Sequence, residues 1–182
     1  LGSTGLVGHG ISSYLLQKNF YVFGTSYSKK IRSINSNFRL YKNINLTDPK
    51  SFFKINKIIK KNKIQAIINS AALIPNKLNY NKKYFYEKSI IINLFSYFEL
   101  YKIIKKNKIK FLINISTPNV KEINSKNIEM HHNFYIYTKY LAEMYLSNIQ
   151  KSDLNIVSLR TKSPYGYILN TKAVIPNFIN RL

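Results

Sequence analysis

The chain opens on LGSTGLVGHG, residues 1–10, in which glycine recurs at every third position as Gly2, Gly5 and Gly8. Glycines at this spacing permit a tight turn, close approach of a ligand to the backbone, and close packing of the following helix on a sheet. The free N–H groups and the dipole at the start of that helix favour an anion, for which a pyrophosphate is the natural candidate. The stretch therefore predicts a phosphate-binding turn, although such glycines also occur as ordinary turn residues.

Helical and strand-like patterns alternate along the rest of the chain, with no Pro/Gly/Ser linker between them. We expect helices over residues 6–18, 50–62, 84–107 and 134–149, and strands over residues 20–28, 65–72, 108–116 and 154–160. Asp48 is expected to cap the helix whose first turn holds Pro49. Nearly continuous apolar strands joined by helices indicate parallel strands buried on both faces. The pattern predicts one α/β domain over residues 1–182, built as a doubly wound parallel sheet, with the glycine turn beside Asn69 and Ser116 at its carboxyl edge.

Composition limits the class of protein. With 182 residues, 45% of them hydrophobic, the chain can bury the core of one domain. It contains no apolar run of the ~18 to 20 residues that a membrane crossing needs, and we expect a cytoplasmic protein without a membrane partner. The absence of cysteine excludes disulfides and thiolate metal sites, and the three histidines have no zinc-like spacing, so we expect no structural metal.

The net charge of +22, from 29 basic and 7 acidic residues, invites a nucleic-acid interpretation. The lysines, however, are spread among Asn, Ile, Tyr and Phe along the chain instead of gathering on one arginine-rich element. We interpret most of them as residues of solvated helix faces. The positive charge should also attract anionic ligands, and a phosphate-bearing cofactor or a nucleotide sugar fits that attraction as well as nucleic acid does. We expect no nucleic-acid partner.

Tyr135 and Lys139 are four residues apart in a predicted helix and therefore share a face. A phenol has a pKa of about 10, and a fixed neighbouring cation favours its phenolate form, so the tyrosine could transfer protons near neutral pH. With 15 tyrosines and many lysines in the chain, this pair could also arise by chance.

The order of these features resembles the extended short-chain dehydrogenases/reductases, the NAD-dependent epimerase/dehydratase group. The glycine turn comes first, Asn69 to Ala72 follow a strand, Ser116 and Thr117 end the next strand, and Tyr135 and Lys139 lie on the following helix. The resemblance continues through Leu159 and Arg160 to the turn at residues 164–166. It implies a Rossmann-like fold, an NAD(P) cofactor and a nucleotide-sugar substrate, and it admits a homodimer.

The resemblance also assigns roles. Thr117 would bind the reacting hydroxyl or carbonyl, Tyr135 would be the general acid/base, and Lys139 would hydrogen-bond the nicotinamide ribose and lower the tyrosine pKa. Asn93 matches an asparagine of the family's long helix. The residues expected to bind the cofactor are Gly2, Thr4, Gly5, Leu6, Val7, Gly8, Ser26, Ser28, Lys29, Asp48, Asn69, Ala71, Ala72 and Lys139.

The end of the second strand bears on the choice of cofactor. NAD-preferring folds place an acidic residue there for the adenine ribose. Residues 25–30 contain no carboxylate, but they offer hydroxyls at Ser26 and Ser28 and cations at Lys29 and Lys30 for a 2'-phosphate. We therefore expect NADP(H) in preference to NAD(H). Asn45 stands where relatives often have an adenine-contacting aspartate, which marks this pocket as unusual.

The chain also departs from the family pattern. The strand expected before the glycine turn is absent, Leu1 stands where threonine is common, and the chain stops at Leu182 where the family continues into its substrate-binding part. We therefore expect a piece truncated at both ends. Pro118 and Asn119 replace the acidic residues that help dehydratases expel water, which disfavours dehydration. An epimerase and a reductase, including one similar to dTDP-4-dehydrorhamnose reductase, remain open, as does a catalytically inactive NAD(P)-binding module.

Overall fold

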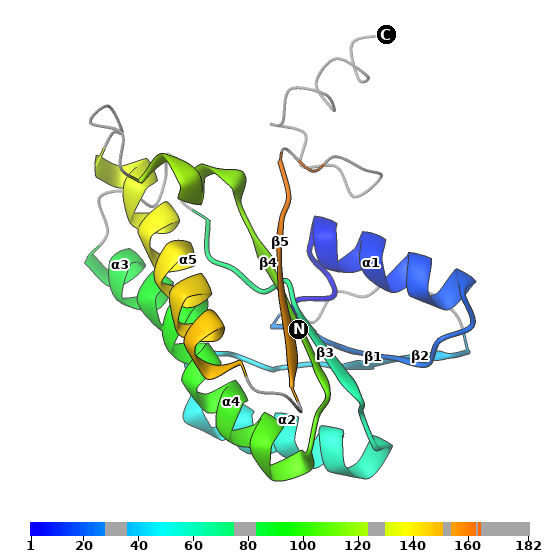
Figure 1. Cartoon of the computed structure of the whole chain (residues 1–182). Coiled ribbons are helices and arrows are strands. Elements are labelled where there is room, and N and C mark those ends of the chain that lie inside the picture. The colour runs from blue at the N-terminus through cyan, green and yellow to red at the C-terminus, as the bar shows by residue number, and fades with distance from the viewer. Residues whose placement is uncertain (28–35, 75–82, 124–129, 151–153, 163, 165–182) are drawn as a thin grey trace, which may run out of the picture. The chain divides into compact units, whose positions relative to one another are not determined.

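The computed structural model describes residues 1–27, 36–74, 83–123, 130–150, 154–162 and 164 (Figure 1). The chain divides into two compact units, of which the first contains Leu1–Ile44 and the second is Asn45–Thr161. Each unit is described by itself.

The first unit contains helix α1 (Leu6–Gln17) and strands β1 (Val22–Thr25) and β2 (Phe38–Tyr41). The two strands pair in parallel, with Val22 opposite Phe38, and α1 packs against β1. Gly24 is required in β1, because a Cβ atom there would lie 2.4 Å from Ser3 Oγ and 2.8 Å from Phe38 Cζ. The turn at the start of the chain therefore lies directly against this strand.

The second unit is built on a parallel three-stranded sheet in the order β3-β4-β5. Its strands are β3 (Ala66–Asn69), β4 (Phe111–Ser116) and β5 (Asn155–Arg160), and its α-helices are α2 (Pro49–Asn62), α3 (Lys83–Ile90), α4 (Ser96–Asn107) and α5 (Met130–Ile149). A π-helix (Ile91–Phe95) joins α3 to α4, and a 3-10 helix (Pro118–Glu122) follows β4. All of the strand pairs are parallel, as the alternating pattern predicts.

In this unit α3, α4 and α5 lie on one side of the sheet (Figure 1). Leu112 of β4, Leu100 of α4 and Leu146 of α5 are at most 1% exposed and form part of the core between them. On the opposite face of the sheet Val157 and Leu159 are 47% and 45% exposed. The expectation of helices on both faces is thus met on one face within this unit.

Helices α2 and α4 end in the same eight residues, KIIKKNKI, at positions 57–64 and 102–109. Both close with a left-handed lysine, Lys63 at φ 49° and Lys108 at φ 53°. The N–H of Ile64 then donates to Ile59 O at 3.2 Å, and the N–H of Ile109 donates to Ile104 O at 3.1 Å. This is the Schellman arrangement, in which an apolar residue after the left-handed position packs back on the helix.

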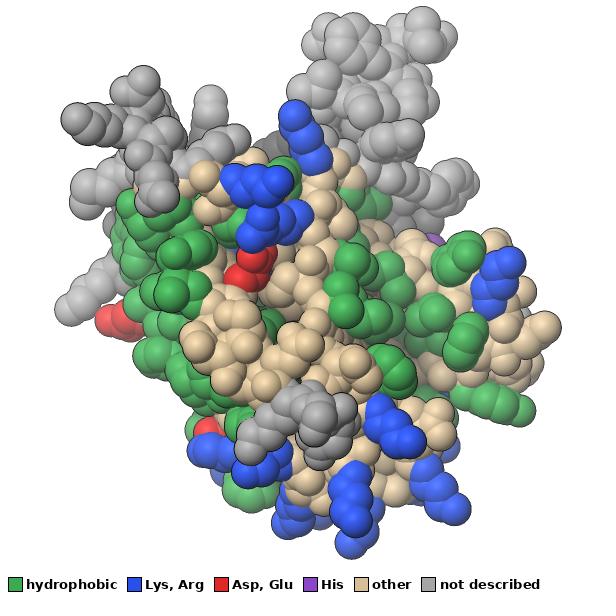
Figure 2. All heavy atoms as spheres, viewed as in Figure 1, with side chains coloured by type: hydrophobic (Ala, Val, Ile, Leu, Met, Phe, Trp, Pro, Cys, Tyr) green, Lys and Arg blue, Asp and Glu red, His purple; other side chains and the backbone are tan. Residues whose placement is uncertain are grey.

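Lysine side chains around these two helix ends are exposed, and Figure 2 shows basic groups gathered there. Cations at helix carboxyl ends complement the helix dipole. The exposure of Lys60, Lys61, Lys105 and Lys106 agrees with the interpretation of the lysine excess as solvated helix faces. Lys139, which is 1% exposed, differs sharply from them.

Most of the expected elements are confirmed, with α1, α2, β3 and β5 within a few residues of prediction. Strand β2 was not expected, the long helix is interrupted by the π-helix, and α5 begins at Met130, earlier than predicted. The turn predicted at residues 164–166 lies largely outside the described residues. None of the described helices combines the length and apolar character that a bilayer crossing requires.

Candidate active site

The glycine turn of the first unit is fixed on the end of β1. Both the N–H and the hydroxyl of Ser3 donate to Thr25 O at 3.1 Å. Gly2 has φ 74°, a left-handed conformation that strongly favours glycine. The N–H of Gly5 donates back to Gly2 O at 3.1 Å and closes the turn. The predicted tight turn is confirmed, and its anchor, Ser3, was missed in the sequence.

Helix α1 begins without a capping side chain. Gly5 is its N-cap residue, and the first hydrogen bond along the helix runs from His9 N–H to Gly5 O at 2.8 Å. The N–H groups of Leu6, Val7 and Gly8 in the first turn are therefore uncapped by any side chain. Uncapped amides at the positive end of a helix dipole fit a phosphate group, so these residues suit the anionic part of a dinucleotide.

The hydroxyls of Thr4 and Ser26 hydrogen-bond each other at 2.9 Å. Ser26 is only 2% exposed, and its backbone N–H donates to Tyr41 O at 3.0 Å. Because it is buried and hydrogen-bonded, Ser26 has a structural role at the end of β1 and is not exposed for contact with a ligand. Ser28 and Lys29, the other residues expected around a 2'-phosphate, lie outside the described residues.

Lys139 and Tyr135 lie one turn apart on α5 in the second unit, as their spacing predicts. Burial lowers the pKa of Lys139 to about 8, while the carboxylate of Glu143 opposes that change. Burial raises the pKa of Tyr135. The expectation that the neighbouring ammonium lowers the tyrosine pKa is therefore not met in the chain without ligand, because desolvation dominates.

Two buried polar atoms near the carboxyl ends of β3 and β4, Asn69 Nδ2 and Ser116 Oγ, make no close hydrogen bond within the described residues, although Asn69 lies near enough to the Tyr97 hydroxyl to oppose the rise in its pKa that burial causes. The hydroxyl of the half-buried Thr117 does not cap the 3-10 helix that follows it. In the described part of the chain the Lys139 ammonium likewise makes no hydrogen bond or ion pair. Buried polar groups are normally satisfied, so this set indicates a place where a polar ligand supplies the missing partners.

Asn93 links three parts of the unit from inside the π-helix. Its side chain accepts from Leu73 N–H at 2.9 Å and donates to Leu73 O at 3.1 Å. It also donates to Thr138 Oγ1 at 3.1 Å, and Thr138 in turn donates to Tyr135 O at 2.7 Å. Asn93, which is fully buried, thus ties the segment after β3 to the turn of α5 between Tyr135 and Lys139.

A second polar set crosses the sheet in register, since Asn69, Asn114 and Ser158 occupy paired positions on β3, β4 and β5. The Tyr97 hydroxyl donates to Asn114 Oδ1, and Asn114 Nδ2 donates to Ser158 Oγ at 3.1 Å. Burial raises the pKa of Tyr97. The sequence pattern does not reveal this network, because the register that aligns its residues is defined only by the pairing of the strands.

The remaining predicted residues have structural partners. Asp48 caps α2, accepting from Lys50 N–H at 2.9 Å, which confirms its expected capping role. Asn45 Oδ1 accepts from the N–H and hydroxyl of Thr47 at 3.1 and 2.9 Å. Ala71 N–H donates to Asn69 Oδ1 at 3.2 Å and so shapes the segment that continues through the partly exposed Ala72.

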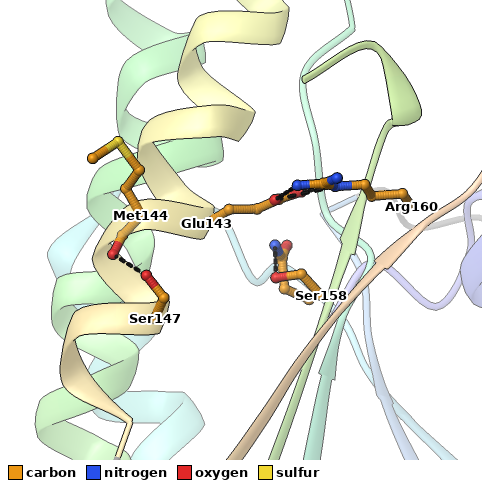
Figure 3. A network of polar contacts seen from close by, with 6 residues as sticks. Glu143, Met144, Ser147, Ser158 and Arg160 are labelled. Carbon is orange, nitrogen blue, oxygen red and sulfur yellow. Dashed lines mark hydrogen bonds and ion pairs between the residues drawn. The ribbon is translucent and has the colours of Figure 1, made fainter. Parts of the chain in front are cut away.

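The structure brings the predicted residues together in two groups. Thr117, Asn69, Tyr135 and Lys139 belong to the second unit, where α5 packs on β4, β5 and the 3-10 helix. The glycine turn and Ser26 belong to the first unit. Glu143 and Arg160, which form a close ion pair in the second unit, were not identified as site residues (Figure 3). The spacing of Glu143, four residues after Lys139, was the available signal.

The parallel α/β architecture and these two groups of residues define a class, the Rossmann-like proteins of the short-chain dehydrogenase/reductase type. Within it the chain belongs to the NAD dependent epimerase/dehydratase family, whose family model matches residues 1–182. No curated protein sequence matches the chain.

Solved structures of similar fold include two enzymes of Bordetella bronchiseptica. WbmG in complex with NAD is 19% identical with a TM-score of 0.70, over 99% of this chain and 57% of that one. WbmH in complex with NAD+ is 19% identical with a TM-score of 0.65, over 87% and 53% of the two chains. ElxO with NADP bound is 20% identical with a TM-score of 0.63, over 78% and 61%. The chain therefore spans less than two thirds of each of these proteins.

Proposed function

We propose that this chain forms the cofactor-binding and catalytic part of an NAD(P)-dependent epimerase or reductase acting on a nucleotide sugar. The observation that carries the proposal is the burial of Lys139, one turn after Tyr135 on α5, in the same unit as the buried polar side chains at the ends of β3 and β4. Family membership supports it, and so does the relative WbmG, whose structure was also solved in complex with NAD and UDP.

The residues present fit a dinucleotide. The uncapped first turn of α1 would hold the pyrophosphate, and Lys139 would donate to the hydroxyls of the nicotinamide ribose. When bound, the nicotinamide supplies the hydride chemistry. The protein must then orient the sugar and move one proton.

Thr117 would position the substrate oxygen, and Tyr135 would transfer that proton. The Thr117 hydroxyl would hydrogen-bond the substrate oxygen and hold it near the phenol of Tyr135. Because burial raises the pKa of Tyr135, its resting form is the neutral phenol, which can donate a proton to an oxygen that gains charge during reduction. In the reverse direction the phenolate form of Tyr135, which the Lys139 cation would stabilise, accepts the proton of the substrate hydroxyl and becomes the neutral phenol.

The residues after Thr117 favour epimerisation or reduction over loss of water. Pro118 and Asn119 begin the 3-10 helix, and neither offers a carboxyl group to protonate a departing hydroxyl. An epimerase needs reversible oxidation of one carbon, and a reductase needs only delivery of hydride and a proton. Both reactions use the same three side chains.

The test is the turnover of the whole protein carrying Tyr135→Phe. Loss of the hydroxyl should reduce kcat by ~10² to 10⁴, the usual contribution of a general acid/base, and leave cofactor affinity nearly unchanged. Tyr137→Phe is the matched control, because Tyr137 is 44% exposed and lies on another face of α5. Near-normal turnover in Tyr135→Phe would refute the assignment, and cofactor binding without any turnover in the wild type would favour the inactive binding module.

We also propose that the adenosine end of the site prefers NADP(H). Residues 25–30 lack a carboxylate, and Lys29 and Lys30 provide cations for a 2'-phosphate. Binding of NADH as tight as that of NADPH would contradict the preference.

A further inference from the structure

Glu143 forms the only ion pair between a helix and a strand within the described residues. It lies one helical turn after Lys139 on α5 and accepts two hydrogen bonds from Arg160 Nε at 3.2 Å and one from an Arg160 terminal nitrogen at 2.7 Å (Figure 3). The Glu143 side chain is 12% exposed and that of Arg160 is 36% exposed. A forked arginine and carboxylate pair has a defined geometry as well as attraction.

Arg160 holds this carboxylate at the carboxyl edge of the sheet, where the candidate site residues lie. It is the last residue of β5 and lies opposite Ser116, the last residue of β4. The next N–H, that of Thr161, donates to Ser116 O at 3.1 Å. The ion pair therefore fastens α5 to the carboxyl end of β5, which lies next to the end of β4 that leads into Thr117.

Glu143 lies four residues after Lys139 on α5, so the two side chains share a face of the helix. Tyr135 shares that face, and Arg160 of β5 binds Glu143. Tyr97 of α4 lies close enough to Tyr135 and Glu143 for their charges to add to the rise in its pKa that burial causes. Among these, Glu143 is the one that favours the ammonium form, against the burial that disfavours it. The forked contact with Arg160 fixes the orientation of that carboxylate.

We propose that Glu143, oriented by Arg160, is a positioning residue for Lys139: it holds α5 in place at the strand ends and supplies the counter-charge of the ammonium. The inference rests on the proposed function, because it concerns the lysine of that site. Glu143 contacts neither substrate nor cofactor in this account and acts only through Lys139.

The test compares the pH profiles of kcat/KM for the whole protein as wild type, as Glu143→Gln, and as the exchange Glu143→Arg with Arg160→Glu. Glu143→Gln should move the alkaline limb of the profile to lower pH by about one unit, because Lys139 loses its counter-charge. The exchange should restore the ion pair and the free energy of unfolding but leave the alkaline limb displaced. Glu99→Gln is the matched control, since Glu99 pairs with Lys102 at 2.6 Å in an exposed site on α4.

An unshifted profile in Glu143→Gln, or full recovery of the profile in the exchange variant, would overturn the proposal. The pH dependence of the unfolding free energy provides the same comparison without turnover. There, Glu143→Gln should move the pH range in which Lys139 titrates to lower values, and an unmoved range would also overturn it. A wild type without turnover would instead refute the proposed function. In that case the pH dependence of the unfolding free energy would still test whether Glu143 stabilises the charged form of Lys139.

Discussion

Among the lysines in the part of the chain that the structure describes, Lys139 differs most from the others in its burial. It is 1% exposed, and burial lowers its pKa to about 8 although the carboxylate of Glu143 opposes the shift. Burying an ammonium group without a close partner destabilises the folded chain, whereas an apolar side chain at the same position would not. Ionisable groups with strongly shifted pKa values cluster at functional sites, which agrees with the role proposed for this lysine.

The cost of burying Lys139 should be measurable as a pH effect on stability. Since its pKa is lower in the folded than in the unfolded chain, the unfolded chain binds more protons between about pH 8 and the ordinary lysine pKa of 10.5. The unfolding free energy of the wild type should therefore rise with pH in this window relative to Lys139→Met. The full change is about 3 kcal/mol.

Urea unfolding of both proteins at several pH values between 7 and 10 checks this prediction. Lys139→Met should be the more stable protein at pH 7, and its advantage should shrink as the pH rises. Lys102→Met, at an exposed position, is the control and should follow the wild type. Parallel curves for Lys139→Met and the wild type would contradict the buried, destabilised cation.

The placement of Tyr135 and Lys139 one turn apart on a helix could be predicted from the sequence. The helical repeat alone places Tyr135 and Lys139 on one face, so their spacing was sufficient. Their pKa values could not be predicted, because they depend on how deeply α5 is buried by other elements. Glu143 follows the same spacing rule, but its proposed positioning role could not be predicted, because that role depends on the ion pair with Arg160 of β5.

At the scale of elements, the repeated octapeptide allows a matched experiment. Lys63 and Lys108 end α2 and α4 in the left-handed conformation, which costs a residue with a Cβ atom roughly 1 kcal/mol. Lys63→Gly and Lys108→Gly should each raise the free energy of unfolding by about 0.5 to 1 kcal/mol. The gain should be smaller than the full conformational cost, because glycine loses more backbone entropy on folding than lysine does.

Lys61→Gly provides the contrast, because Lys61 lies inside α2 and glycine there should destabilise the protein by up to ~1 kcal/mol. Chemical denaturation of the three variants gives the comparison. Destabilisation by Lys63→Gly would show that its side chain contributes more than the backbone conformation costs.

The elements that could be predicted are those with strong local signals. Asp48 and Pro49 define the start of α2, and the glycine turn defines the start of α1. Strand β2 was missed because its sequence, FRLY, includes a charged residue and none of its four residues is buried, so it lacks the apolar run of a core strand. The π-helix was missed because Asn93 bonds to Leu73 and Thr138, which are distant in sequence, and local propensity does not contain those contacts.

At the scale of the whole molecule, the proposed function assigns cofactor residues in both compact units. The first unit contains an uncapped helix N-terminus that suits a phosphate, and the second contains the buried Lys139. On this proposal, changes in either set of residues should lower the affinity for the cofactor.

The most direct measurement is a fluorescence titration of NADH and NADPH into the whole protein, as wild type and as Lys139→Met, with Lys63→Gly as control. The wild type should bind both cofactors, NADPH more tightly, and Lys139→Met should weaken both by about tenfold, which is the loss of one hydrogen bond from a charged donor. Lys63→Gly should bind like the wild type. Absence of binding in the wild type, or unchanged affinity in Lys139→Met, would contradict the central claim that this lysine belongs to a nicotinamide cofactor site.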